Sequence, residues 1–153
     1  MRAGATAGET HLPNYRFDKL FNPHEANELI PTLDLLMRDL QMRTGELRSA
    51  ITAILKVDPA IEDLQLPQII ERHPQLREPA ARMAELANKI ESLGCFLKDI
   101  DQGLVDFPWE IEDDNVVFLC WQFGEDRIVA WHPVEGGFGQ RRPLPGTAKP
   151  YLN

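Results

Sequence analysis

The sequence predicts an α+β fold, in which a long antiparallel helical hairpin with coiled-coil character precedes a small antiparallel β-sheet. Apolar residues recur at seven-residue spacing from Ala26 to Ile54, which is the repeat of a helical seam. After Gly94 the spacing of apolar residues falls to two, which is the repeat of a β-strand. A chain of 153 residues with 43% hydrophobic residues can form one domain with its own core.

The sequence divides the chain into three parts. Residues 1–20 are rich in Gly, Ala and Thr and are expected to be flexible. A single α+β domain is expected over 21–144, with the helical hairpin at 22–93 and the β-rich part at 95–132. Residues 145–153 contain Pro145 and Pro150 and are predicted to form an extended tail.

The first helix is predicted to begin at Pro23. Asn22 is a capping residue type, proline suits the first helical position, and Glu25 completes a capping box. Pro31 should kink or reset the helix, because proline has no N–H to donate, and Asp58-Pro59 should end it. Two apolar rows form the seam: Ala26, Leu33, Leu40, Leu47 and Ile54 in one, and Ile30, Met37 and Ile51 in the other, with Thr44 as a polar exception.

A second helix is predicted over residues 79–93. Four prolines between 59 and 79 exclude one continuous helix there, although 66–72 can form a short helical turn. Gly94 is a suitable residue for ending the second helix. Two helices with facing apolar stripes and a modest connection indicate an αα-hairpin.

Four strands are expected after Gly94. They cover 95–100, 104–107, 116–122 and 127–132. Pro108 should stop the second strand, and the last two strands should form a β-hairpin. Residues 116–122 are apolar throughout, as in a strand that is covered on both faces.

The charge of the chain is concentrated in the β-rich part. Nine acids and one base lie between Gly94 and Asp126, which equals the whole net charge of −8. A pI near 5.0 argues against a nucleic-acid partner, which requires a basic patch, and against an electrostatic membrane partner. No apolar run is long enough to cross a membrane, and the first residues lack the apolar core of a secretion signal, so we expect a cytoplasmic protein. Cys95 and Cys120 do not form a CxxC pair and are expected to be buried, unpaired side chains.

The strongest candidate for chemistry is a metal site made of Asp99, Asp101, Asp106 and His132. Asp99 and Asp101 should point to one face of an extended strand, where two carboxylates repel unless a cation or hydrogen bonds compensate. Asp106 could fold back toward them after the turn at Gly103, and His132 could add a nitrogen. Carboxylates with an imidazole suit Mn²⁺, Fe²⁺ or Zn²⁺, and carboxylates alone suit Mg²⁺ or Ca²⁺.

A structural interpretation of the same residues stands beside the metal site. Asp101 precedes Gly103 as in an ordinary turn, Asp99 can pair with a basic side chain, and Asp106 can accept backbone hydrogen bonds near Pro108. His132 can donate a hydrogen bond to a carbonyl. The chain contains no ligand spacing such as HExxH or a calcium loop.

Other catalytic patterns are weak. The two serines, Ser49 and Ser92, fall in predicted helices, and no GxSxG is present. The segment from Gly136 to Arg142 combines glycines with two arginines and could hold an anion, but it does not open a predicted helix, so a surface loop is the alternative. The three tryptophans could line a pocket or serve in cross-strand packing.

Five segments resemble a bacterial family of unknown function, DUF2203. They are FNPHEANELIPTL (21–33), GCFLKDIDQGLVDFP (94–108), VFLCWQFGE (117–125), IVAWH (128–132) and GFGQRRPL (137–144). The second and third segments are the specific ones. The resemblance implies no activity for this chain, and it indicates that residues 94–144 are its characteristic part.

Two functions follow as hypotheses. The first is a non-enzymatic binding or scaffold protein that forms a homo-oligomer through its helices and presents the acidic, aromatic sheet to a protein partner. The second is a metal-dependent, hydrolase-like enzyme that uses Asp99, Asp101, Asp106 and His132 with a divalent metal ion.

Overall fold

The computed structural model describes residues 10–12 and 15–145. The helices are α1 (Pro23–Glu28), α2 (Ile30–Val57), α3 (Leu66–Arg72) and α4 (Arg77–Glu91), with 3-10 turns at Pro59–Asp63, Pro74–Leu76 and Phe138–Gln140. The strands are β1 (Thr10–Leu12), β2 (Tyr15–Phe17), β3 (Phe96–Asp99), β4 (Leu104–Glu112), β5 (Asn115–Gln122), β6 (Ala130–Pro133) and β7 (Arg142–Pro143). The predicted α+β class is therefore confirmed.

The predicted helix start is confirmed in detail. The Asn22 side chain accepts a hydrogen bond from the Glu25 N–H at 2.8 Å, and the Glu25 carboxylate accepts one from the Asn22 N–H at 2.9 Å. Pro31 follows the break at Leu29 that separates α1 from α2, as its missing N–H predicts. The helix ends at Asp58, as expected.

Removing the cap should weaken the fold by a small, measurable amount. We expect Asn22→Ala to lower the free energy of unfolding by about 1 kcal/mol, because one end-of-helix N–H loses its partner. Urea denaturation measures the change. Asn88→Ala, an exposed position inside α4, is the matched control and should leave stability unchanged or slightly raised. An equal loss in both variants would contradict this account of the cap.

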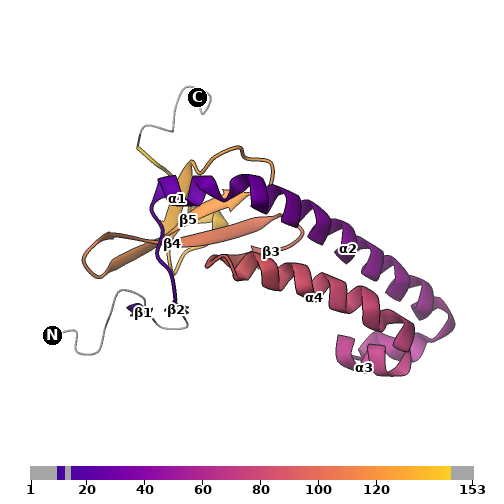
Figure 1. Ribbon diagram of the computed structural model, residues 1–153. Helices are drawn as coiled ribbons and strands as arrows, with labels where there is room; N and C mark the ends of the chain where they lie inside the picture. The colour runs from indigo at the N-terminus through magenta and orange to yellow at the C-terminus, as the bar shows by residue number, and fades with distance from the viewer. Residues whose placement is uncertain (1–9, 13–14, 146–153) are drawn as a thin grey trace.

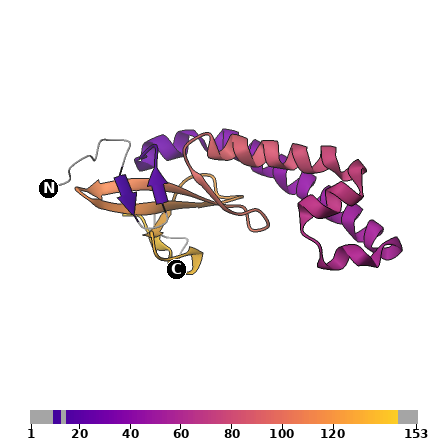
Figure 2. The ribbon, with the colours of Figure 1, turned by 90° about the horizontal axis from the view of Figure 1, so that it is seen from below.

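Helices α2 and α4 lie side by side and extend beyond the sheet, with α3 at their far end (Figures 1 and 2). The second helix begins at Arg77 and not at Pro79, because the 3-10 turn Pro74–Leu76 leads directly into it. Gly94 lies beyond its end with a φ of +102°, a backbone conformation that favours glycine. The coiled-coil character expected of this pair of helices stays a prediction.

The far end of the two helices has its own small core. Leu47, Ile61, Ile69 and Leu76 are buried there. Asp58 accepts hydrogen bonds from Arg72 at 2.6 and 2.9 Å and lies 2.7 Å from the His73 ring. The hydrogen bonds from Arg72 and then His73 hold the pKa of Asp58 well below its usual range. This ion-paired aspartate joins the end of α2 to the end of α3.

Strands β3 to β7 form one antiparallel sheet in sequence order, with each strand beside the next. The expectation that Pro108 ends a strand is wrong, because β4 continues through it to Glu112. β3 pairs with β4 only as far as Asp106, so Pro108 faces an open edge where no N–H is needed. Its carbonyl accepts the Phe21 N–H at 2.7 Å on that edge. β6 also begins three residues later than expected, at Ala130.

Both faces of the sheet are covered. Val105, Phe107, Leu119 and Trp121 face the helices and pack in one cluster with Leu33, Met37 and Leu40 of α2. Phe118 lies on the opposite face and contacts Phe17 edge-on, with ring centroids 6.0 Å apart. β5 is accordingly buried from Val116 to Trp121, as its apolar sequence predicts.

Part of the segment expected to be flexible has regular structure. β1 and β2 pair as an antiparallel two-stranded sheet, and Phe17 at the end of β2 is fully buried. The expected tail lies outside the described residues except for residue 145. In the part of the chain that the structure describes, no helix is long and apolar enough to cross a membrane.

Candidate metal centre in the sheet

The strand register brings three chemically active side chains to one face of the sheet. Asp106 on β4 lies directly opposite Cys120 on β5. Cys120 pairs in turn with Ala130 on β6, two residues before His132, so His132 points to the same face. All three residues are buried, with 3% of Asp106, 1% of Cys120 and 2% of His132 exposed. We call these residues the Asp–Cys–His cluster.

The hydrogen bonds of His132 orient its ring. Nδ1 lies 2.8 Å from the Pro133 carbonyl oxygen, and Nε2 lies 3.0 Å from the Asp106 Oδ2 atom. A carbonyl oxygen only accepts hydrogen bonds, so Nδ1 carries a proton and donates it. When His132 is protonated, Nε2 also carries a proton and can donate it to the Asp106 carboxylate. In that state the metal-free cluster is a buried imidazolium–carboxylate pair.

Protonation of His132 should couple stability to pH in the metal-free protein. Burial lowers the pKa of His132, but the hydrogen bond and charge of Asp106 and the bond to Pro133 outweigh it and raise the pKa above 6.5. The protonated His132 ring therefore stabilises the folded state. This stabilisation is complete below about pH 6.5 and is lost as pH rises through the pKa of His132 in the folded protein. Urea denaturation at pH values above 6.5 should therefore show that the free energy of unfolding falls as pH rises. The His132→Gln variant should lack this fall, and the His24→Gln variant, changed at an exposed position, should keep it. A slope unchanged by His132→Gln would contradict the assignment.

The thiol of Cys120 is protonated in the absence of a metal. Burial raises its pKa to about 12, and the charge of Asp106 adds to the shift. Burial also raises the pKa of Cys95 to about 12. We expect neither thiol to react with iodoacetamide at pH 8 in the folded, metal-free protein, and both to react in urea, because the thiolate is the nucleophile. Mass spectrometry measures the labelling. Rapid labelling of Cys120 in the folded protein would contradict its buried, protonated state.

A small cavity borders all three members of the cluster. Its volume is about 90 Å³, and its wall also contains Lys98, Gly136, Gly137 and Phe138. The Lys98 Nζ atom lies 3.6 Å from the Asp106 Oδ2 atom and 4.5 Å from the centre of the Phe118 ring. The glycine-rich segment thus forms one wall of the cavity. Its arginines are engaged elsewhere, Arg141 with Glu125 at 2.8 Å and Arg142 over the Trp131 ring at 5.0 Å.

The structure brings together two of the four residues expected to bind a metal. Asp106 and His132 meet as described, but Asp101 forms a two-point ion pair with Arg48 of α2, at 2.6 and 3.2 Å. The hydrogen bond from Arg48 lowers the pKa of Asp101. Asp99 accepts a hydrogen bond from the Gln102 N–H at 2.9 Å. These two carboxylates therefore take the structural roles of turn and ion pair, because β3 ends at Asp99 and Asp101 lies in the turn.

Cys120 is the member of the cluster that sequence reasoning missed. It was expected to be buried, and that is confirmed, but it was assigned no chemistry. The spacing of the β4–β5 hairpin contained a signal for its position. Glu112 pairs with Asn115 at the tip of the hairpin, and after one register shift the same pairing places Asp106 opposite Cys120. Trp121 takes the packing alternative, since it is fully buried in the core with its Nε1 donating to the Glu125 carbonyl at 2.9 Å, whereas Trp131 borders a surface groove.

The cluster fits a metal ion by its donor atoms. One oxygen, one sulfur and one nitrogen lie within 4.8 Å of one another. Ligands of one Zn²⁺ bond at about 2.0–2.3 Å, so two of them lie at most about 4.6 Å apart, and a small inward movement lets all three share an ion. Among the described residues, this is the group of at least three His, Cys, Asp or Glu side chains whose ligand atoms are close enough together to hold one metal ion.

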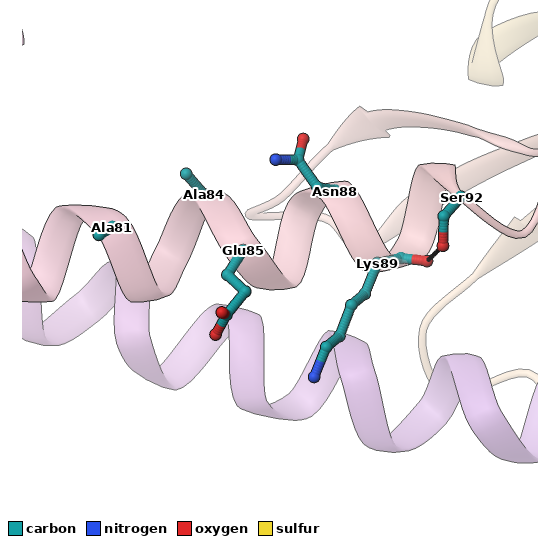
Figure 3. Close-up of a pocket in the computed structure, with 6 residues that line it drawn as sticks. All are labelled: Ala81, Ala84, Glu85, Asn88, Lys89 and Ser92. Atoms are coloured by element: carbon teal, nitrogen blue, oxygen red, sulfur yellow. Dashed lines mark hydrogen bonds between the residues drawn. The ribbon is translucent and has the colours of Figure 1, made fainter.

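A larger hollow on the helices has a different character. It has a volume of about 510 Å³ and lies along α4, between residues 81 and 92. Ala84 and Asn88 point away from α2, while Glu85 and Lys89 point toward it (Figure 3). Only exposed side chains line it, and no buried titratable group faces it. The Asp–Cys–His cluster is therefore the better candidate for chemistry.

The fold and the cluster together define a class, a small α+β protein with buried oxygen, sulfur and nitrogen donors on one face of an antiparallel sheet. The chain belongs to the family described as "Uncharacterized conserved protein (DUF2203)", whose model matches residues 19–144. This match confirms the resemblance noted in the sequence. The comparison with curated proteins found no match, and the comparison with solved structures found none either.

Proposed function

We propose that this protein is a metal-dependent, hydrolase-like enzyme that holds one Zn²⁺ ion between Asp106, Cys120 and His132. The orientation of His132 carries the proposal. Metal-binding histidines donate their second ring N–H to a carbonyl or carboxylate, which fixes the ring and leaves the other nitrogen for the metal. His132 makes this bond from Nδ1 to Pro133, so Nε2 is directed at Asp106, and one ligand atom from each of the three residues lies within 4.8 Å of the others.

The identity of the donors favours zinc over the alkaline-earth ions. A thiolate and an imidazole suit Zn²⁺, whereas Mg²⁺ and Ca²⁺ take oxygen ligands. Binding requires the loss of two protons, one from the Cys120 thiol and one from His132 Nε2, so affinity should rise with pH. Mn²⁺ and Fe²⁺, which the sequence alone left open, fit the set less well because of the sulfur.

Three protein ligands leave one coordination position for a water molecule or a substrate. Structural zinc sites fill all four positions with protein ligands, and catalytic sites keep one open. A bound Zn²⁺ with an open position polarises a substrate oxygen and lowers the pKa of water, which is the chemistry of hydrolysis. The small cavity beside the cluster supplies room for that fourth ligand.

Calorimetric titration with Zn²⁺ tests the proposal. We expect the chelator-treated wild-type protein to bind one ion per chain, and Cys120→Ala to lose this binding. Cys95→Ala is the matched control, because Cys95 is an equally buried thiol that donates to the Ile90 carbonyl and lies outside the cluster. Asp101→Asn should also retain binding. The proposal fails if wild-type and Cys120→Ala proteins bind zinc alike.

A second candidate is a scaffold protein that self-associates with a second copy of the chain through coiled-coil contacts of its helices. Most of the predicted seam is used inside the chain, since Leu33, Leu40 and Leu47 are buried. The supporting observation is that Leu35 and Met42, seven residues apart on α2, are 69% and 53% exposed. A protein partner would then meet the acidic sheet, where a groove contains Ile111 and Trp131.

Light scattering during gel filtration tests this second candidate. A dimer that becomes monomeric in the Leu35→Glu, Met42→Glu double variant would support it. A wild-type monomer at high micromolar concentration would exclude it. Exposed charge changes on α2 should leave zinc binding intact, so the two candidates are tested separately.

A further inference from the structure

We propose that residues 136–141 form a lid over the Asp–Cys–His cluster, and that Arg141 is the latch that holds this lid closed. We call these residues the strap. The inference rests on the proposed zinc site, to which the open lid admits metal and substrate, but the movement itself is measured without metal. Its basis is the position of the strap, the contacts of Arg141 and the freedom of two glycines.

The strap covers the cluster from outside the sheet. Gly136, Gly137 and Phe138 border the same small cavity as the three members of the cluster. Cys120 follows Phe118 by two residues on β5, so the cluster lies on the face of the sheet away from α2 and α4. The yellow-orange segment that contains the strap lies on this side of the sheet (Figure 2). The strap is therefore part of the cover that keeps the three donors at most 3% exposed.

Arg141 fastens the strap to β5 and to the turn after it. Its Nη2 atom donates to the Glu125 Oε2 atom at 2.8 Å and lies 3.4 Å from the Cys120 carbonyl oxygen. Its guanidinium group also lies over the Phe138 ring, 4.8 Å from the ring centre. One side chain thus ties the wall of the cavity to the strand that carries Cys120.

The latch is only partly satisfied when the strap is closed. The Nε atom of Arg141 is buried and has no hydrogen-bond partner among the described residues. A buried donor of a charged group without a partner costs free energy, which offsets part of the gain from the ion pair with Glu125. In the open strap this donor reaches water. The closed form is therefore held weakly enough to open and close, as a lid requires.

Gly137 and Gly139 give the strap a backbone freedom that its closed form does not need. A Cβ atom at either position would meet no other part of the described chain within 4 Å, and neither glycine has a positive φ. Neither packing nor turn geometry therefore explains these glycines, whereas movement of the segment benefits from both. The Gln140 N–H donates to the Gly137 carbonyl at 2.8 Å and the Arg141 N–H to the Phe138 carbonyl at 3.2 Å, so these backbone bonds stay within the strap when it moves.

Thiol labelling of the full, metal-free chain measures the opening. Methyl methanethiosulfonate, a small thiol reagent, is added to the folded protein at constant pH, and mass spectrometry follows the modified fraction of each cysteine with time. Cys120 reacts only while the strap is open, because the closed strap buries its thiol. Cys95 is buried outside the cluster, so it reports any general loss of structure in the same sample.

Variants of the strap should change the labelling of Cys120 alone. We expect Arg141→Gln to raise its rate about tenfold, because a charge-assisted contact of the closed form is lost, and to leave the rate at Cys95 unchanged. Phe138→Ala, which removes the wall of the cavity, should act in the same direction. Arg142→Gln is the matched control and should equal the wild type, because this arginine lies over the Trp131 ring and not at the cavity. Equal Cys120 rates in wild-type and Arg141→Gln proteins, or a parallel rise at Cys95, would overturn the lid.

Zinc kinetics separate the lid from the proposed function. Arg141→Gln should take up zinc and release it to a chelator about tenfold faster with an unchanged dissociation constant, because a lid sets both rates, whereas a merely structural contact changes the affinity. Wild-type protein that binds no zinc would refute the zinc site and leave the thiol result to decide on the lid. Zinc binding with the same uptake and release rates in both proteins would overturn the lid alone.

Discussion

Asp106→Asn is expected to lower the free energy of unfolding of the metal-free protein by about 3 kcal/mol, because it removes one charge of a buried pair. Asp106 and His132 are almost fully buried and lie 3.0 Å apart. Without the carboxylate, the imidazolium loses the charge that offsets its burial. Asparagine has nearly the same shape as aspartate, so the loss measures electrostatics and not packing. Urea denaturation below pH 6.5, where His132 is protonated, gives the largest effect.

Asp101→Asn provides the matched control for this experiment. Asp101 also forms an ion pair, with Arg48, but both side chains are more than 60% exposed. Solvent screens such a pair, so the expected change in stability is small. If Asp101→Asn destabilised the protein as much as Asp106→Asn, burial would not be the property that distinguishes the two aspartates.

Zinc binding should stabilise the native protein by about as much as Asp106→Asn destabilises it. At a free Zn²⁺ concentration 100-fold above the dissociation constant, a ligand that binds only the folded state adds about 2.7 kcal/mol. For a chain of this size the melting temperature should rise by about 5 to 10 °C. Differential scanning calorimetry with zinc, and again after excess EDTA, should show the rise and its reversal.

Two cysteine variants decide whether the stabilisation comes from the Asp–Cys–His cluster. Cys95→Ala should keep the zinc-dependent rise in melting temperature, and Cys120→Ala should lose it. Both replace a buried thiol by a methyl group, so their intrinsic packing losses are similar. An equal rise in both would assign zinc binding to another part of the chain.

Local sequence signals predicted the start of the first helix correctly. Asn22, Pro23 and Glu25 act through contacts three residues apart, so the sequence alone determines the cap. Pro108 does not end β4, because the effect of a proline in a strand depends on whether a neighbouring strand needs its N–H, and β3 ends before it reaches Pro108. The buried Phe17 escaped prediction for a similar reason, since its partners Phe96 and Phe118 lie about 80 or more residues away in the sequence.

The candidate site was predicted only in part. Residue chemistry points to Asp106 and His132, and the structure places them together. The predicted place of Asp99 and Asp101 in the site depends on a strand that continues past Asp99, whereas the chain turns there. The place of Cys120 opposite Asp106 follows from cross-strand register, which a one-residue shift would reverse. Composition therefore indicated which residue types mattered, and the pairing of strands decided which of them meet.

The most direct test of the zinc site is elemental analysis of untagged protein purified without chelators, followed by incubation with Zn²⁺ and removal of free metal. We predict one zinc per chain in the wild type and in Cys95→Ala, and none in Cys120→Ala. Wild-type protein that carries no zinc and takes up none under these conditions would contradict the account. The Asp–Cys–His cluster would then be a structural ion pair beside a buried thiol.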